Sequence, residues 1–507
     1  MELFARKRKE EWEGVGIKRM HQQLSTTEII AARRDIDLPF ELKVVTAEGI
    51  KKVVCRSILR LLPTKRLVAQ GECDGESVVV KVFLDRARDR HLTKERQGIE
   101  AIAGAGVRTP QLRWVGYLED RNARVLGFEY LNEAVGLDDL WQGPATEAER
   151  IDILSNVMIT MARLHNAGIY QEDIHLANFL LCEGNLHTID GGGVETRYRG
   201  ENISESRCMA NLALFFAQFY AKDDELVRQV FPVYESTRQW QSESSRNDRL
   251  LRQIQKRRST RKKLYLDKTF RECTRFVCRS DFFSYQVCER SAYTEPMQQL
   301  MSDPDASISS GKLLKDGNSS TVALVDISGK LLVIKRYNIK NVWHGIKRVM
   351  RRSRAWTSWC NAHRMAFLGI PAMKPVAMME RRLGPLRLAA FFVSEFVDAP
   401  DAIGCLASKD QPNGEMEQIV ALLHDMSEAK ISHGDLKASN FLMAATGPVI
   451  IDLDDMKEHK WEHSFQRAFG KDMHRFLDNW AEYPNLSNQF ARLLQKPTSD
   501  YLTESAG

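Results

Sequence analysis

The chain of 507 residues is 43% hydrophobic and carries a formal net charge of +6, which is small for its length. This composition excludes a globally disordered or collagen-like chain and predicts roughly two to four domains. A protein that coats nucleic acid along its whole length would be more basic, so that class is excluded as well.

The nine cysteines form no CxxC pair, which argues against a zinc site or a secreted disulfide framework. Reduced thiols in a cytosolic protein are the simplest interpretation. The start, MELFARKRKEEWEG, is basic but no apolar stretch follows it, so no signal peptide is expected. No apolar run is long enough to span a bilayer, and we expect a soluble or peripheral protein.

The first half of the chain predicts an N-terminal extension at 1–39 and an α+β domain at 40–220. The β-branched run GESVVVKVF predicts a strand that carries Lys81. A helix that stops at a glycine follows, and then strands at QLRWVGYLED and VLGFEYL. An amphipathic helix then leads into the loop QEDIHLANFL, which contains Asp173 and Asn178.

The second half repeats this order after a region at 221–294 that predicts a charged, helical linker. In the predicted second domain, at 295–500, the run GKLLVIKRY places Lys335 on a strand. A later amphipathic helix leads into the loop HGDLKASNFL, which contains Asp435 and Asn440.

The spacing of the polar residues is the same in both halves. Asp173 precedes Asn178 by five residues, and Asp190 follows Asn178 by twelve. The same two intervals separate the members of the second set, which are Asp435, Asn440 and Asp452. A match of both intervals, together with the shared Asn-Phe-Leu, predicts two tandem domains rather than a short repeat.

A strand lysine, a loop aspartate, an asparagine and a later aspartate serve one well-known chemistry together, which is phosphoryl transfer. The lysine cation reaches the phosphates, and one asparagine with one aspartate suits Mg²⁺, which takes few protein ligands. The loop aspartate accepts a hydrogen bond from the attacking hydroxyl and orients it. Asp435 and Asp173 are therefore the candidate catalytic residues, with Lys335 and Lys81 as the candidate phosphate cations.

These motifs resemble the protein-kinase-like superfamily, which implies two bilobal domains, each with a β-rich and a helical lobe. By this resemblance Asn440, Asp452, Asn178 and Asp190 are the metal ligands of ATP-bound Mg²⁺. LKDGNSSTVALV resembles a reduced glycine-rich loop, whose backbone N–H groups at Gly317, Asn318, Ser319 and Ser320 would cover the phosphates. The first domain offers only PTKRLVAQGECDG for this loop.

The closer resemblance is to the bacterial lipopolysaccharide core heptose kinase family. It rests on HGDLKxxNFL followed by IDLDD, and on LLKDGNSSTV, LVIKRYN and the block RRSRAWTSWCNAHRMAFLGIP. The resemblance implies phosphorylation of a sugar, heptose by expectation, on the lipid A–core acceptor at the cytoplasmic face of the inner membrane. After Asp452 no Ala-Pro-Glu-like element appears, which also favours a non-protein acceptor.

The segment 335–354 is rich in Lys and Arg and contains Trp343 but no Asp or Glu. A solvated helix face is the plain alternative, but such a helix also suits an anionic membrane surface. The charge would serve nucleic acid equally, although no nucleic-acid partner is expected. The sequence does not indicate an oligomeric state.

The two domains depart from the kinase pattern in different ways. The first keeps Glu95, eleven residues before Gly106, as the helix glutamate that pairs with the strand lysine. The second has Ser358 at the corresponding position, so Lys335 either lacks a partner or takes one from elsewhere. Alternatives are therefore a regulatory or scaffold protein whose domains bind nucleotide without transfer, or a kinase for another small molecule or a protein.

Overall fold

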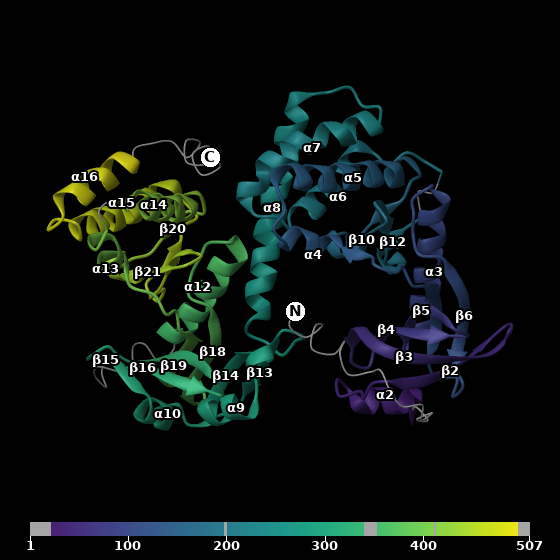
Figure 1. Cartoon of the computed structure of the whole chain (residues 1–507), viewed down its shortest axis with the longest axis horizontal. Helices are drawn as coiled ribbons and strands as arrows, with labels where there is room; N and C mark the ends of the chain where they lie inside the picture. Colours follow the sequence, from purple (N-terminus) through teal and green to yellow (C-terminus); the bar gives the residue numbers. More distant parts are fainter. Residues whose placement is uncertain (1–21, 197–199, 339–351, 410–411, 495–507) are drawn as a thin grey trace. The chain divides into compact units, whose positions relative to one another are not determined.

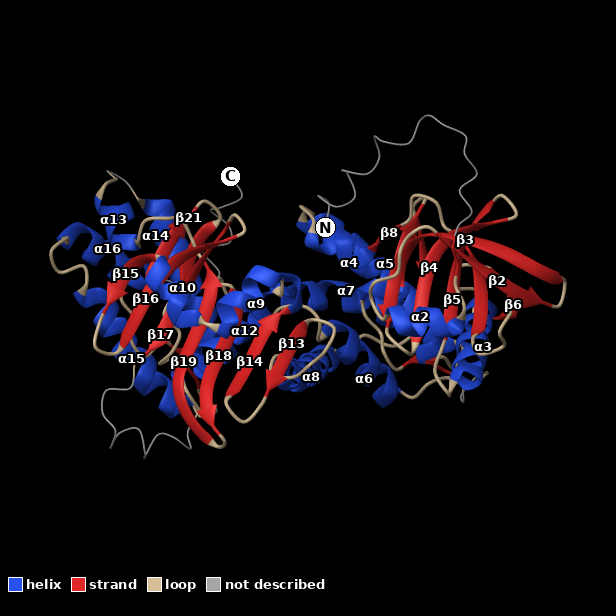
Figure 2. Ribbon diagram, turned by 90° about the horizontal axis from the view of Figure 1, so that it is seen from below, coloured by secondary structure: helices blue, strands red, loops and turns tan. Residues whose placement is uncertain are grey.

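The computed structural model describes residues 22–196, 200–338, 352–409 and 412–494 (Figure 1). The chain divides into two compact units, Met1–Arg257 and Arg258–Gly507, which we call the first and second unit. Each unit contains a largely antiparallel sheet and a separate, mainly helical part (Figure 2). The content of each unit agrees with the predicted α+β class.

The sheet of the first unit has the order β1-β2-β3-β4-β5-β7-β6, and β2 also pairs with β6 so that the sheet curls on itself. Its buried core consists of the inward-facing residues of the strands, among them Leu42, Val53 and Val80. The strands are β1 (Gln22–Gln23), β2 (Phe40–Thr46), β3 (Gly49–Leu62), β4 (Arg66–Cys73), β5 (Glu76–Phe83), β6 (Leu112–Leu118) and β7 (Arg124–Glu129).

The helical part of the first unit surrounds a second core that includes Met158, Leu212 and Phe231. Its helix α5 begins with a capping box, in which Thr146 and Glu149 satisfy each other's backbone N–H groups. The remaining α-helices and strands are α2 (Thr26–Ala32), α3 (Arg88–Gly104), β8 (Val135–Gly136), α4 (Leu137–Gln142), α5 (Glu147–Asn166), β9 (Tyr170–Gln171), β10 (Phe179–Cys182), β11 (Asn185–Thr188), β12 (Val194–Glu195), α6 (Glu205–Phe216), α7 (Asp224–Thr237) and α8 (Ser244–Lys268), whose residues from Arg258 onwards belong to the second unit.

The sheet of the second unit has the order β13-β14-β18-β19-β17-β16-β15. Helix α12 packs on β18 and β19 and contributes buried Trp359 and Met365 to the main core. The strands are β13 (Phe276–Ser280), β14 (Ser284–Glu289), β15 (Lys312–Asp316), β16 (Ser320–Ile327), β17 (Lys330–Tyr337), β18 (Pro375–Leu383) and β19 (Leu386–Glu395).

Helix α12 has well-defined ends, because the Ser353 side chain accepts from the N–H of Trp356 and Gly369 closes the helix with a positive φ of 73°. The other elements of the second unit are α9 (Glu295–Ser302), α10 (Pro304–Ser310), α12 (Arg354–Leu368), α13 (Ala402–Ala407), α14 (Asn413–Glu428), β20 (Ile431–Ser432), β21 (Phe441–Ala444), β22 (Gly447–Ile450), β23 (Lys457–Glu458), α15 (Glu462–Asp478) and α16 (Pro484–Leu493).

The two units share a five-stranded part, which is β3-β4-β5-β7-β6 in the first and β15-β16-β17-β19-β18 in the second. The register around the predicted lysines is also the same. Lys81 pairs with Val68 on the preceding strand, and Lys335 pairs with Val322. Residues of the two units can therefore be compared position by position.

The region 221–294, predicted as a charged helical linker, is divided between the two units. Helix α7 and the start of α8 bury Phe231, Leu250 and Ile254 in the first unit. The strands β13 and β14 belong to the sheet of the second unit. The prediction missed these strands because both are short and because β13 does not alternate buried with exposed residues.

Candidate active sites

The second unit contains a cavity of about 390 Å³ between its sheet and the hairpin β21–β22. Lys335 from β17, Asn440 from the loop before β21 and Asp452 after β22 all line it. Apolar residues form the opposite walls, and these are Val322, Val333, Phe392, Leu442 and Ile451. The structure thus brings together the strand lysine and both predicted metal ligands of the second half.

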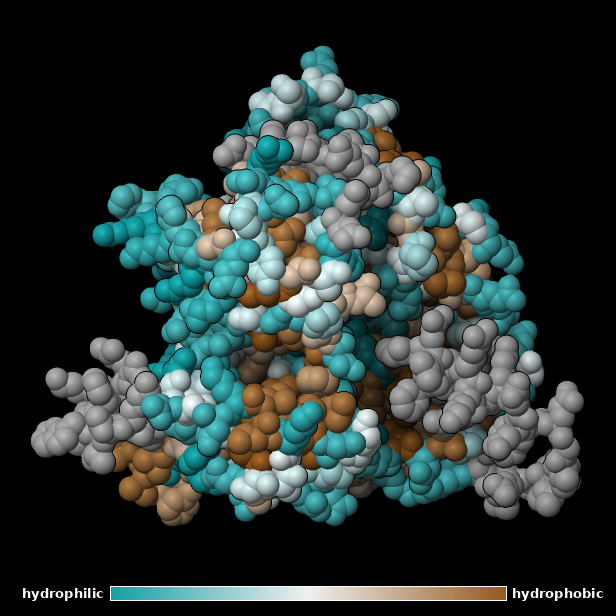
Figure 3. All heavy atoms as spheres, turned by 60° about the vertical axis from the view of Figure 1, so that its left-hand side comes forward, coloured by the Kyte–Doolittle hydropathy of each residue, from teal (hydrophilic) through white to brown (hydrophobic). Residues whose placement is uncertain are grey.

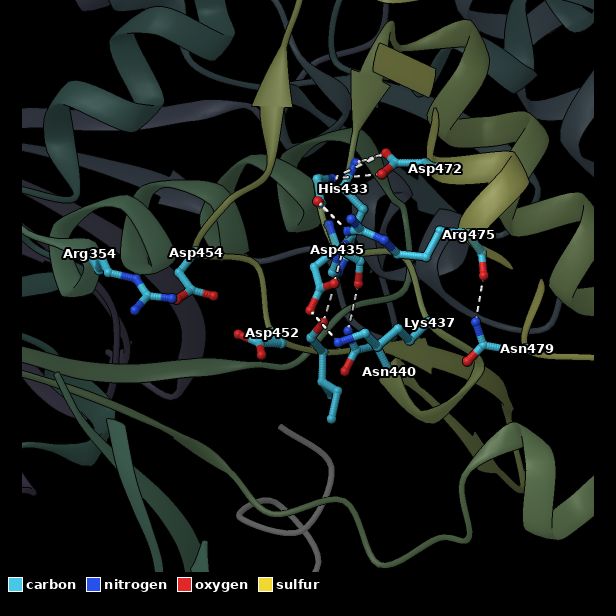
Figure 4. Close-up of polar contacts among 12 residues, drawn as sticks. Arg354, His433, Asp435, Lys437, Asn440, Asp452, Asp454, Asp472, Arg475 and Asn479 are labelled. Carbon is cyan, nitrogen blue, oxygen red and sulfur yellow. Dashed lines mark hydrogen bonds and ion pairs between the residues drawn. The ribbon is translucent and has the colours of Figure 1, made fainter. Parts of the chain in front are cut away.

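Two cations hold Asp435 from opposite sides (Figure 4). Lys437 Nζ lies 3.0 Å from Asp435 Oδ2, and Arg475 Nη1 lies 2.9 Å from Oδ1. Arg475 also donates to the carbonyl of Gly434 at 2.8 Å. The carboxylate is only partly buried, so it keeps an accessible edge in a fixed orientation.

The loop that carries Asp435 is anchored by Asp472 of α15, which is buried. Its carboxylate accepts from the backbone N–H of His433 at 2.6 Å and of Gly434 at 3.0 Å. The ring of His433 is buried as well, and its Nε2 lies 3.0 Å from the carbonyl oxygen of Ile451. Both side chains therefore position the loop rather than reach a substrate.

The amide of Asn440 has a defined orientation. Its Nδ2 donates to the carbonyl of Asp435 at 2.9 Å, and a carbonyl only accepts, so this atom must be the nitrogen. Within the described residues Oδ1 receives no hydrogen bond, which suits it as a metal ligand.

Asp452 has a left-handed backbone with φ of 62° and forms an ion pair with Lys335. Burial raises the pKa of Asp452, but a hydrogen bond with Asp454 and the charge of Lys335 together hold it below its usual value. The Asp452 carboxylate is therefore ionised at neutral pH. An ionised carboxylate and a carbonyl-type oxygen are oxygen donors of the kind that Mg²⁺ takes.

Lys335 has a second partner, Asp454, whose Oδ1 lies 3.5 Å from Nζ. Asp454 is buried, and its other oxygen pairs with Arg354 in the first turn of α12. Burial and the hydrogen bond with Asp452 raise the pKa of Asp454 to about 6. Figure 4 shows Arg354 and Asp454 facing each other beside Asp452.

The missing helix glutamate of the second unit is thus replaced by a carboxylate from the loop after β22. Ser358, which occupies the glutamate position, hydrogen-bonds the hydroxyl of Tyr337 at 2.8 Å instead. The sequence contained the replacement in IDLDD, but no spacing rule identified it. Arg475 was also missed, although it follows Asp472 by three residues and so shares its helix face.

The predicted glycine-rich loop of the second unit fits its role only in part. Ser320 is buried and lines the cavity, whereas Gly317, Asn318 and Ser319 do not line it. The N–H of Gly317 donates to the carbonyl of Ser320 at 3.1 Å. The prediction that this N–H covers phosphates is therefore corrected, because the turn itself uses the donor.

In the first unit, Lys81 on β5 pairs with Glu95 of α3, as predicted. Glu95 is fully buried and also accepts from the N–H of Gly191 at 3.2 Å. A side chain at Gly191 would clash, because a Cβ there would lie 2.3 Å from the carbonyl oxygen of Glu95. The triple glycine after Asp190 thus serves close packing against α3 and is more than a flexible turn.

Asp190 matches Asp452 in backbone conformation, with φ of 71°. Its carboxylate lies 3.7 Å from Lys81 Nζ and 3.9 Å from Arg66 Nη1. Burial raises the pKa of Asp190, but the charges of Lys81 and Arg66 outweigh this effect and hold the pKa below its usual value. A cavity of about 440 Å³ adjoins these groups.

Asn178 is oriented opposite to Asn440. Its Oδ1 accepts from the backbone N–H of His175 at 2.8 Å, and an N–H only donates. This hydrogen bond takes one of the two lone pairs of the Asn178 oxygen, whereas Asn440 Oδ1 receives no hydrogen bond from the described residues. The predicted metal ligand of the first unit is therefore less free to bind a metal than its counterpart in the second. Asp173 is exposed and forms no ion pair within the described residues, unlike Asp435.

The loop of the first unit is also anchored differently. Asn211 of α6 donates to the carbonyl of Gln171 at 2.7 Å, and its Oδ1 lies 3.0 Å from His165 Nε2. His165 Nδ1 in turn lies 2.8 Å from the hydroxyl of Tyr234. Burial lowers the pKa of His165 to about 4, so the ring is neutral near pH 7.

Neither unit holds a cluster of three or more His, Cys, Asp or Glu side chains suited to a metal ion within the described residues. No helix in that part of the chain is long and apolar enough to cross a membrane.

Residues 309–495, all within the second unit, match the model of the Lipopolysaccharide kinase (Kdo/WaaP) family. This match confirms the resemblance that the motifs of the second half indicated. Because the family consists of kinases, it also confirms the enzyme class, a phosphotransferase with a hydroxyl acceptor. No curated protein matches the chain.

Two solved structures are similar to parts of the chain. One is WaaP in complex with acyl carrier protein, with 20% identity and a TM-score of 0.29, covering 39% of this chain and 88% of that one. The other is the Mycobacterium tuberculosis PknI kinase domain, with 14% identity and a TM-score of 0.26, covering 40% and 96%.

Proposed function

We propose that the second unit transfers a phosphoryl group from ATP to a sugar hydroxyl, heptose by preference, of the lipopolysaccharide inner core. The observation that carries this proposal is the placement of Lys335, Asn440 and Asp452 around one cavity, with Asp435 held beside it. The family match of the same residues supports the acceptor class.

The cavity suits a nucleotide because part of its lining is apolar and another part carries Lys335, Asn440 and Asp452. Apolar side chains from the sheet and from the β21–β22 hairpin can sandwich an adenine ring. Lys335 and the metal ligands lie at the end where the phosphates would extend. Mg²⁺ held by Asn440 Oδ1 and Asp452 would neutralise charge on the phosphates.

The other residues of the site orient the acceptor hydroxyl and neutralise charge on the phosphates. Asp435, fixed by Lys437 and Arg475, accepts a hydrogen bond from the acceptor hydroxyl and orients it. Lys335 neutralises charge on phosphate oxygens. Asp454 holds the ammonium group of Lys335 in place when Asp452 binds a metal ion. The first unit is either a second kinase or a regulatory nucleotide-binding unit in this proposal.

A direct test separates the two units. Asp435→Ala and Asp173→Ala are made singly in the full chain, with Asp478→Ala on the exposed end of α15 as control. Core phosphate in the producing cell and ATP turnover in vitro are measured. We expect Asp435→Ala to lose both. Full phosphorylation by both loop variants would overturn the proposal.

We also propose a peripheral location on the cytoplasmic face of the inner membrane, where ATP and the acceptor are both accessible. Of the basic segment 335–354, residues 339–351 lie outside the described residues. Support comes from the tips of the β13–β14 and β18–β19 hairpins. At the β13–β14 tip Phe282 is 59% and Phe283 67% exposed. Gly384 N–H donates to the carbonyl of Phe282 at 2.8 Å, which joins the two tips.

Leucines extend this apolar surface, and these are Leu383, Leu386 and Leu388, all exposed. Arg381 and Arg387 flank it, although both have carboxylate partners. Figure 3 shows apolar side chains gathered on the lower part of one face. Exposed aromatic residues beside cations suit the interface of an anionic bilayer.

Vesicle binding tests the location. Phe282→Ser/Phe283→Ser should sediment with phosphatidylglycerol vesicles less than the unaltered chain, whereas Leu264→Ser, another exposed apolar change, should not. Equal sedimentation of all three chains would contradict a role for the hairpin tips.

A further inference from the structure

The first unit has a cavity of the same kind as the second, but with a different balance of charge. Arg60, Arg66 and Lys81 line it together with Asp190 and Glu129. The corresponding cavity of the second unit has two lining cations, Lys315 and Lys335, for its carboxylates Asp452 and Glu395. One additional cation therefore faces the first cavity.

The position of Arg66 explains this difference. It lies two residues before Val68, which pairs with Lys81. Ser320 lies two residues before Val322, which pairs with Lys335 in the same way. Arg66 thus occupies the register position that a small, buried serine holds in the second unit.

The guanidinium of Arg66 is held over the site. It lies 5.1 Å from the centre of the Phe83 ring and 3.9 Å from the carboxylate of Asp190. Its side chain is only 21% exposed. The strand pairing, the ring and the carboxylate together fix a cation at the phosphate end of the cavity.

The two predicted metal ligands of the first unit, Asn178 and Asp190, also interact with other groups of the chain. Asn178 Oδ1 accepts from His175 N–H, and Asp190 is shared by Lys81 and Arg66. Mg²⁺ demands several well-placed oxygen ligands. In the first unit each oxygen donor meets one more N–H group or cation than its counterpart in the second unit, where Asn440 Oδ1 receives no hydrogen bond from the described residues and Asp452 pairs with Lys335. The predicted ligand set of the first unit therefore suits a divalent cation less well than that of the second unit.

The parts that recognise a nucleotide are nevertheless retained. Lys81 keeps its buried partner Glu95. Apolar residues of β4, β5, β7 and the β10–β11 hairpin with the residue after it line the cavity, and these are Val68, Val79, Phe128, Leu180 and Ile189. Among the described residues, in contrast, no cation pairs with Asp173 as Lys437 and Arg475 pair with Asp435. The site is therefore organised for binding and not for orienting an acceptor hydroxyl.

We propose that the first unit binds a nucleoside di- or triphosphate without a divalent cation, with Arg66 supplying the positive charge that a metal supplies elsewhere. This inference rests on the proposed nucleotide-dependent function of the chain. It assigns the first unit a regulatory or structural nucleotide site and leaves phosphoryl transfer to the second.

The test uses the full chain with Lys335→Met, which weakens nucleotide binding by the second unit. Binding of a fluorescent ATP analogue is measured in excess EDTA and in excess Mg²⁺. We expect binding in EDTA at least as tight as in Mg²⁺. Arg66→Ser should weaken binding in EDTA about tenfold or more, and Arg66→Lys should weaken it less.

A strict requirement for Mg²⁺ in the Lys335→Met chain would overturn the inference. Equal binding by the Lys335→Met and Lys81→Met/Lys335→Met chains would also overturn it, because the signal would then not arise in the first unit. Thermal unfolding of each variant shows whether it is folded. If Arg66→Ser is not folded, the nucleotide binding of Arg66→Lys in EDTA tests the role of Arg66 instead.

The unaltered chain is assayed in parallel for phosphoryl transfer in Mg²⁺, and this assay reports on the proposed function alone. Transfer without binding in EDTA would remove only the present inference. Absence of transfer with binding in EDTA would remove the kinase proposal and leave the nucleotide site of the first unit standing.

Discussion

Lys335 Nζ lies 3.5 Å from Asp454 Oδ1, and this pair performs in the second unit what Lys81 and Glu95 perform in the first. The lysines occupy the same register position, but the carboxylates come from different parts of the fold. Glu95 projects from a helix, whereas Asp454 follows Asp452 by two residues. The carboxylate that positions the lysine and the predicted metal ligand therefore lie on one short loop.

Asp454→Asn should reduce kcat because Lys335 then has only Asp452 as a carboxylate partner. Displacement of a positioned group by about 1 Å costs roughly 100-fold in rate, which sets the expected scale. Asp455→Asn, which changes the exposed neighbour, should leave kcat nearly unchanged. Steady-state kinetics with varied ATP distinguish a change in kcat from a change in KM.

The double variant Asp454→Asn/Ser358→Glu sharpens this prediction. It restores an acid at the helix position beside Lys335, where Ser358 lines the same cavity. We expect the double variant to recover part of the lost kcat. If Asp454→Asn alone has normal kinetics, Lys335 does not need this partner.

Arg475→Ala should lower kcat by about ten- to a hundredfold with little change in the KM for ATP, because Arg475 contacts Asp435 and Gly434 but not the cavity. Arg475→Lys should retain more activity, since it keeps the charge. Arg467→Ala on the exposed surface of the same helix is the control. An unchanged kcat for Arg475→Ala would show that Lys437 suffices to fix Asp435.

Asp472→Ala should destabilise the second unit by about 1–3 kcal/mol, because the N–H groups of His433 and Gly434 lose their buried acceptor. Denaturant unfolding monitored by tryptophan fluorescence measures this change. Asp478→Ala on the same helix should have little effect. If Asp472→Ala abolished activity at unchanged stability, the residue would have a direct catalytic role.

The sequence predicted those parts of the site that depend on local order along the chain. The strand pattern identified Lys335, and the repeated spacing identified Asn440 and Asp452; the structure brings all three to one cavity. It did not predict Asp454 or Arg66, because their roles depend on which strand or helix lies opposite. The direction of a side-chain hydrogen bond also depends on the folded structure. The sequence QEDIHLANFL therefore did not predict that Asn178 Oδ1 accepts from the N–H of His175.

The buried histidine of the first unit predicts how stability depends on pH. The pKa of His165 is about 4 in the folded chain against an ordinary value of 6.5, so the folded state binds this proton more weakly than the unfolded state. The associated stability is fully present above pH 6.5 and is lost as the pH falls from 6.5 towards 4. The expected slope is about 1.4 kcal/mol per pH unit for one proton.

His165→Gln should make unfolding of the first unit less sensitive to pH in this window, even if the variant is less stable at pH 7. Denaturant unfolding at several pH values between 4 and 7 measures both slopes. Because His165 holds Asn211, which holds the carbonyl of Gln171, acidification should also loosen the loop that carries Asp173. Equal slopes for the two chains would show that a group other than His165 controls acid unfolding of the first unit.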